Sequence, residues 1–234
     1  KKKKIQGYEL KDLVNPMYPN LINRIRQIIE DSEKSFSENK SVAEDSFLWE
    51  HTFYVSAIAR MICQSEDLDP LLPVIAALFH DIGKFADAKY HPDDTPEEQI
   101  AAQLARKILG EESMEEAQIR EIVLGLEALY EEKKTGNLIS DIVHDSDFLA
   151  KFGYLGIANF FSKSTLRGQS LKSSLTRSLS KELTYASVLP ENMRTSTGKK
   201  IALQKRRDTL NFYKALLQEL RNQDIAYFKI KEIT

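Results

Sequence analysis

The stretch Ala76-Ala77-Leu78-Phe79-His80-Asp81-Ile82-Gly83-Lys84 places a His-Asp doublet directly after a continuous apolar run that begins at Val74. Asp69 as an N-cap, proline at position 70 and glycine at position 83 predict a helix that is buried on nearly every side. Burying an aspartate costs free energy unless the carboxylate is paired or binds a metal ion, whereas a neutral histidine needs only a hydrogen bond. Asp81 therefore points to a functional site.

A second histidine is expected close to this doublet. His51 lies in a predicted helix from about Val42 to Gln64, where it shares one face with Val55, Ile58 and Ile62 at helical spacing. This spacing predicts that His51 faces the core together with its apolar neighbours.

An acidic pair, Asp145 and Asp147, supplies the remaining candidate ligands, on a predicted helix from about Leu138 to Ser162. Side chains two residues apart on a regular helix are separated by about 200°, so the two cannot both face one ion. Periodicity leaves the choice between them open. Two imidazoles and two carboxylates suit one divalent cation (Mn, Mg, Fe, Co, Ni or Zn) that can activate water for attack on phosphorus.

The rest of the sequence also predicts helices, so the fold class is expected to be all-α. Glycine and proline are sparse, at 9 and 7 of 234 residues, and apolar residues recur at helical spacing almost throughout. Capping boxes are predicted to open helices at Thr95 and Ser113, with Gly110 ending the first of these helices. Further helices are expected at about 18–36 and 199–222.

Composition narrows the classes of function. The formal net charge of -2 gives no global basic field, so nucleic-acid binding is not expected as the main activity. The single cysteine, Cys63, lies in an apolar helical stretch; it allows no intrachain disulfide and is expected to be a buried, inert thiol in a cytoplasmic protein. No run approaches the ~18 apolar residues of a membrane span, so no membrane association is expected.

The spacing of His51, His80-Asp81 and Asp147 resembles the HD superfamily of metal-dependent phosphohydrolases, whose signature is a His, a later His-Asp doublet and a distant Asp. His80-Asp81-Ile82-Gly83-Lys84 looks like the common form of that doublet, and Ser146-Asp147-Phe148-Leu149 resembles the segment around the last ligand. The resemblance implies the metal ligands His51, His80, Asp81 and Asp147, with Asp145 as an alternative ligand or an outer partner. It also implies an HD-domain helical bundle with additional C-terminal helices.

The likeness extends over about residues 40 to 220. Leu155-Gly156-Ile157-Ala158-Asn159-Phe160-Phe161 and Thr195-Ser196-Thr197-Gly198-Lys199 look like the small bacterial HD hydrolases related to nucleotide pyrophosphohydrolases. We expect a single HD-type domain over residues 1–234, with a core at about 40–165, a C-terminal helical extension at about 166–224 and a short tail at 225–234.

Two departures from the family pattern matter for the chemistry. Residues 122–129 lack the histidines that hold a second metal in several HD branches, so a site with one ion is favoured. The nucleotidase branch often has Glu before the first His, as in Glu50-His51, but an acidic residue one turn after the doublet, where this chain has Lys84. This difference leaves the substrate open.

The remaining roles follow the resemblance. Asp81 is predicted to be catalytic as well as a ligand, since it could orient the attacking water. His91 would assist proton transfer or bind phosphate, with a surface loop histidine as the alternative. Lys84 would bind phosphate or cap the helix C-terminus. Lys151 and Arg167 are further phosphate-binding candidates.

These features predict a phosphohydrolase that cleaves a phosphate ester or anhydride, with a nucleotide as the small phosphorylated substrate and a metal-activated water as the nucleophile. The alternative is a catalytically weak HD domain that binds metal and nucleotide as a regulatory module. A nuclease acting on single-stranded nucleic acid would need a basic groove with stacking aromatic side chains, and the net charge of -2 argues against it.

Overall fold

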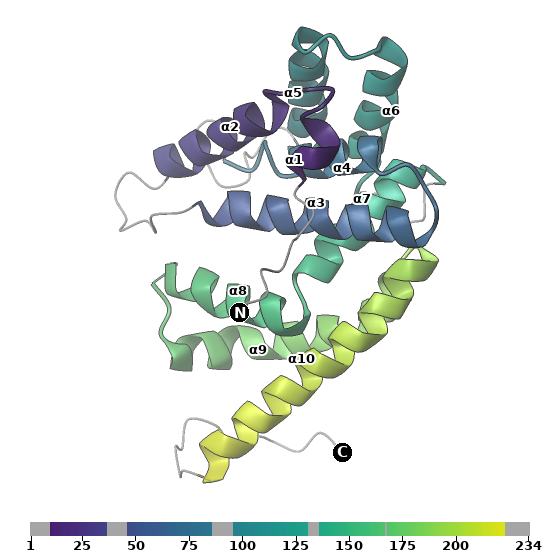
Figure 1. Cartoon of the computed structure of the whole chain (residues 1–234). Helices are drawn as coiled ribbons and strands as arrows, with labels where there is room; N and C mark the ends of the chain where they lie inside the picture. Colours follow the sequence, from purple (N-terminus) through teal and green to yellow (C-terminus); the bar gives the residue numbers. More distant parts are fainter. Residues whose placement is uncertain (1–9, 37–45, 86–95, 131–135, 167, 223–234) are drawn as a thin grey trace, which may run out of the picture. The chain divides into compact units, whose positions relative to one another are not determined.

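The structure is a computed structural model that describes residues 10–36, 46–85, 96–130, 136–166 and 168–222 (Figure 1). These residues form ten helices and no strand, which confirms the all-α prediction. The chain divides into two compact units, residues 1–146 and residues 147–234. The predicted single HD-type domain with its C-terminal extension stays a prediction. No described helix has both the length and the apolar character needed to cross a membrane.

The first unit is built around α4 (Leu71–Phe79), whose residues Val74 to Phe79 are all completely buried. Helices on several sides pack against it, as expected for a helix that is apolar all round. Figure 1 shows α4 among these neighbours in the upper part of the view. They are α1 (Lys11–Val14), α2 (Leu21–Phe36), α3 (Phe47–Ser65), α5 (Glu97–Glu111) and α6 (Glu116–Glu127).

The start of α4 differs slightly from the sequence-based prediction. Pro70 occupies the N-cap position, so the helix begins one residue later than expected. Asp69 still acts at this end, because its carboxylate accepts a hydrogen bond of 2.9 Å from the backbone N–H of Leu71. The side chain therefore satisfies one of the donors that a helix N-terminus leaves without a partner inside the helix.

The predicted ends of α5 and α6 need correction. Gly110 lies inside α5, which continues to Glu111. Helix α6 begins at Glu116 with Glu115 as its N-cap and no capping hydrogen bond from a side chain, so the capping box predicted at Ser113 is wrong. Thr95, which was predicted to open the preceding helix, falls outside the described residues.

The region predicted as one helix from about Leu138 to Ser162 forms two. Helix α7 (Leu138–Ala150) crosses the boundary between the units, and α8 (Gly153–Leu166) starts after a corner at Lys151 and Phe152. Gly153 has φ +76°, a backbone conformation that glycine adopts without strain. The helix predicted to be continuous therefore breaks completely at this glycine.

The second unit contains α8, α9 (Leu171–Asn192) and α10 (Ser196–Asn222). Helix α10 packs against both α8 and α9, and it begins three residues before the predicted start at Lys199. One core cluster holds the unit together. Its fully or nearly fully buried members are Ile157, Leu175, Leu179, Tyr213 and Leu220.

Candidate metal centre

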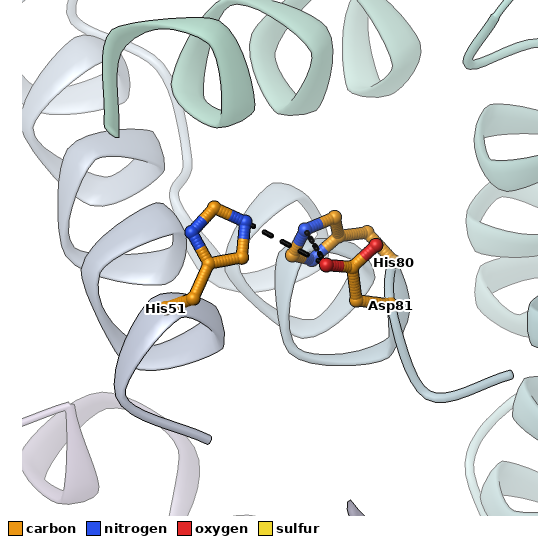
Figure 2. Close-up of side chains that lie close together, drawn as sticks. All are labelled: His51, His80 and Asp81. Carbon is orange, nitrogen blue, oxygen red and sulfur yellow. Dashed lines mark ion pairs between the residues drawn. The ribbon is translucent and has the colours of Figure 1, made fainter. Parts of the chain in front are cut away.

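Three predicted ligands come together in the first unit. The ligand atoms of His51, His80 and Asp81 all lie within 4.8 Å of one another, and Figure 2 shows the three side chains converging. Asp81 Oδ2 is 3.6 Å from His51 Nε2 and 3.5 Å from His80 Nε2. The two imidazole rings have centroids 5.5 Å apart. Two nitrogens and one carboxylate oxygen are thus positioned around a small space.

Helix packing explains how these side chains meet. Val55, Ala59 and Ile62 are completely buried on α3, and α3 packs against α4. His51 lies one turn before Val55 on this face, with its side chain 12% exposed. The predicted inward orientation of His51 agrees with this position. His80 is the C-cap of α4, so the doublet lies where the buried helix ends.

The His80 ring is held in one orientation by the backbone. Its Nδ1 lies 2.8 Å from the carbonyl oxygen of Ala77, one turn earlier. A carbonyl oxygen can only accept, so Nδ1 donates and carries the proton in the neutral ring. Nε2 then presents its lone pair toward Asp81 and His51, which is the tautomer that a metal-binding histidine requires.

Asp81 is 1% exposed, and a cation lies beside it. Lys84 donates from Nζ to Asp81 Oδ2 over 2.8 Å. The Lys84 side chain is 17% exposed, so the ion pair is largely removed from solvent. The lysine compensates part of the cost of burying the carboxylate. The predicted phosphate-binding candidate Lys84 is therefore in direct contact with a predicted metal ligand.

The two aspartates of α7 have different partners. Asp145 is completely buried in the first unit, and its Oδ1 lies 3.1 Å from Nδ1 of the neighbouring His144. Asp147 is 2% exposed in the second unit and accepts a hydrogen bond of 2.7 Å from Nζ of Lys151. The choice of Asp147 over Asp145 as the fourth ligand stays a prediction.

Both carboxylates predicted as ligands are thus paired with a lysine along their own chain segment. The pairs have i,i+3 spacing for Asp81 and Lys84, and i,i+4 spacing for Asp147 and Lys151. Both lysines are predicted phosphate-binding candidates, but their pairing with the aspartates was not predicted. For Asp147 and Lys151 the spacing was an available signal, because residues four apart are neighbours at a helix end. Asp81 and Lys84 lie in the turns that follow α4, where the Lys84 N–H donates to Asp81 O over 3.0 Å. His91 and Arg167 lie outside the described residues, and their roles stay predictions.

Comparison with known proteins supports the resemblance to the HD superfamily. The family model described as HD domain matches residues 48–147. A predicted HD superfamily hydrolase from an uncultured Thermotogales bacterium has a similar structure, with a TM-score of 0.64, 21% sequence identity and coverage of 91% of this chain and 99% of its own. An HD-superfamily hydrolase from Bacillus thuringiensis has a TM-score of 0.61 and 19% identity, covering 88% of this chain and 98% of its own.

A third similar structure is Bacillus subtilis YpgQ in complex with ADP, with a TM-score of 0.61, 18% identity and coverage of 87% of this chain and 96% of its own. No curated protein shows significant sequence similarity to this chain. At these identities the solved structures establish the shared fold. The family match and the His-Asp cluster together support a metal-dependent hydrolase in general terms.

Proposed function

Because residues 48–147 of this chain match the HD-domain family model, we propose that the protein is a divalent-metal-dependent phosphohydrolase that cleaves a phosphate ester or anhydride of a nucleotide. The observation that carries the proposal is the convergence of His51 Nε2, His80 Nε2 and the Asp81 carboxylate within 4.8 Å. A chain that needed only a stable core would gain more from apolar side chains at these buried positions.

The residues present fit a metal ion. Two imidazole nitrogens and a carboxylate oxygen are ligands for first-row divalent metals, and the His80 tautomer already directs Nε2 into the cluster. Asp147 is the proposed fourth ligand. When bound, the ion would lower the pKa of a water molecule and neutralise charge on the phosphoryl group. These ligand types do not select among Mn, Mg, Fe, Co, Ni and Zn, so elemental analysis of the purified chain covers all six.

The chain's own groups have separate parts in the proposed reaction. Ala77 O holds the His80 ring, so this ligand needs no reorientation. The Lys84 ammonium, 2.8 Å from Asp81 Oδ2, is proposed to donate a second hydrogen bond to a phosphate oxygen beside this carboxylate. Lys151 and Arg167 are proposed as further phosphate ligands, and His91 as the group that assists proton transfer.

Support for a nucleotide substrate comes from one relative. The similar Bacillus subtilis structure contains ADP, and its fold covers 87% of this chain. A nucleoside diphosphate carries adjacent phosphates that need several cations, and the lysines next to Asp81 and Asp147 would provide two of them. Nucleoside mono-, di- and triphosphates are therefore the first substrates to screen.

Elemental analysis of the purified full chain, followed by phosphate-release assays with each nucleotide class and added Mn²⁺ or Mg²⁺, tests the proposal. We expect a bound transition metal or metal-dependent turnover, and loss of both in Asp81→Asn. Asp31→Asn, at an exposed carboxylate on α2, is the matched control and should behave as the wild type. Absence of both metal binding and turnover on all phosphate esters would refute the enzyme proposal.

The alternative, a regulatory module that binds metal and nucleotide without efficient catalysis, predicts a different result. Calorimetry would then detect nucleotide binding that depends on the metal and on Asp81, while phosphate release stays at the background rate. The same set of proteins therefore separates the two functions.

A further inference from the structure

The corner between α7 and α8 carries the proposed fourth ligand. Asp147 lies in the last turn of α7, and its lysine partner, Lys151, is the first residue after that helix. The Lys151 backbone N–H bonds to Phe148 O at 3.1 Å, and the Phe152 N–H bonds to Leu149 O at 3.3 Å. The position of Lys151 relative to Asp147 therefore depends on how this corner is held.

Two side chains of α10 bind the backbone of the corner directly. Lys205 Nζ donates to the carbonyl oxygen of Phe152 over 2.8 Å. The Gly153 N–H donates to Thr209 Oγ1 over 2.8 Å, and Thr209 is 2% exposed. Lys205 and Thr209 are four residues apart, so one face of α10 holds two successive backbone groups.

Glycines allow this close approach. A Cβ at Gly153 would lie 3.1 Å from Lys205 Cγ and 3.3 Å from Lys205 Nζ. At Gly156, a Cβ would lie 2.4 Å from the carbonyl oxygen of Lys151, which no side chain could accommodate without a shift. The backbone of residues 151–156 is therefore packed against itself and against α10, and this backbone is what places Lys151, whose side chain is 49% exposed.

The charge at Lys205 is costly to bury. Desolvation lowers the pKa of Lys205, and the nearby Asp208 carboxylate opposes this shift. An ammonium in such a position loses hydration free energy, which the hydrogen bond to Phe152 O recovers in part. Methionine or leucine would fill the same space without the cost of burying a charge. The lysine at this position therefore indicates that its hydrogen bond to Phe152 O has a role beyond apolar packing.

We propose that Lys205 and Thr209 are positioning residues for Asp147: through the Phe152–Gly153 backbone they hold Lys151 beside the Asp147 carboxylate. The inference rests on the proposed function, in which Asp147 is the fourth ligand. Outer partners of metal ligands commonly change metal affinity by about 10- to 100-fold when removed.

The test measures Mn²⁺ dissociation constants of the full chain by titration calorimetry. We expect Lys205→Met to weaken Mn²⁺ binding about 10-fold. Thr209→Val, which keeps the shape of the side chain and replaces only the hydroxyl, should also weaken Mn²⁺ binding. Lys205→Arg should retain most of the wild-type affinity for Mn²⁺. Lys214→Met, at an exposed lysine on the same helix, is the control and should leave the dissociation constant unchanged.

A double-mutant cycle separates positioning from a general structural role. In an Asp147→Asn background, Lys205→Met should cause no further loss of Mn²⁺ affinity, because the group through which it acts is gone. An equal loss in both backgrounds, or an unchanged affinity in Lys205→Met and Thr209→Val alike, overturns the positioning role and leaves the metal site intact. If Asp147→Asn alone binds Mn²⁺ as the wild type does, the proposed fourth ligand is wrong. Should Lys205→Met not fold, the same cycle with Thr209→Val decides.

Discussion

Lys84 Nζ lies 2.8 Å from Asp81 Oδ2, the same oxygen that faces His51 Nε2 at 3.6 Å and His80 Nε2 at 3.5 Å. One buried oxygen thus lies close to the lysine ammonium and to two imidazole nitrogens. A metal ion and the lysine ammonium would compete for this oxygen, because both are attracted to its negative charge.

Substitution of this lysine gives a prediction with a definite sign. Lys84→Met removes the competing cation, so Mn²⁺ should bind as tightly as in the wild type or more tightly. The KM for the phosphorylated substrate should rise about 10- to 150-fold, because a charge-assisted hydrogen bond worth about 1.5–3 kcal/mol is lost. Calorimetry and phosphate-release kinetics measure the two effects separately. Lys34→Met, at an exposed lysine on α2, is the control. Weaker Mn²⁺ binding with an unchanged KM would contradict the phosphate-binding role.

Separate substitution of the two aspartates on α7 tests the choice of ligand. Asp147→Asn should weaken Mn²⁺ binding more than about 100-fold, beyond the range of outer partners, and abolish turnover. Asp145→Asn should have a smaller effect, because Asp145, whose carboxylate lies 3.1 Å from Nδ1 of His144, is proposed only as an outer partner. Elemental analysis and calorimetry report the result. The assignment is wrong if Asp145→Asn loses the metal while Asp147→Asn keeps it.

The helix that presents the His-Asp doublet should dominate the stability of the first unit. Leu78 is completely buried in α4, so Leu78→Ala should lower the free energy of unfolding by about 2–5 kcal/mol. Leu124→Ala, at a side chain 50% exposed on α6, should change it by less than about 0.5 kcal/mol. Urea denaturation followed by circular dichroism measures both. Similar losses in the two variants would refute the central place of α4.

Cys63 gives a prediction for pH dependence. Burial is the main reason that the pKa of this thiol rises to about 12, with Asp69 adding to the shift. The unfolded chain has a thiol pKa of about 8.5, so the unfolded state loses this proton first. The contribution of the thiol to stability is therefore complete below about pH 8.5 and is lost as the pH rises toward the folded pKa.

Two measurements check this prediction. At pH 8 the native protein should react with a thiol reagent only as fast as it unfolds, and denaturant should make Cys63 react at once. Between about pH 9 and 11, the stability of the wild type should fall more steeply than that of Cys63→Ala, by up to about 1.4 kcal/mol per pH unit. Fast labelling of the folded protein would show that the thiol is accessible.

Some features of this protein follow from sequence alone. The apolar run from Val74 to Phe79 can only be a buried helix in an all-α chain, because it lacks a polar face. The free-energy cost of burying the aspartate of a His-Asp doublet at the end of such a helix must be compensated, and this requirement predicted a metal site. Helical periodicity likewise placed His51 on the inward face of α3, since the apolar neighbours on that face are fixed by the core.

Tertiary structure decided the rest. The break at Gly153 depends on the contacts of Phe152 and Gly153 with Lys205 and Thr209, more than fifty residues later in the chain, and no local pattern contains them. The end of α5 at Glu111 and the start of α6 at Glu116 likewise differ from the positions that the glycine and the capping motif predicted. The sequence alone thus determined the buried helix and the inward face of His51, because burial and helical spacing are local. The corner after Asp147 required the folded chain, because its partners are remote.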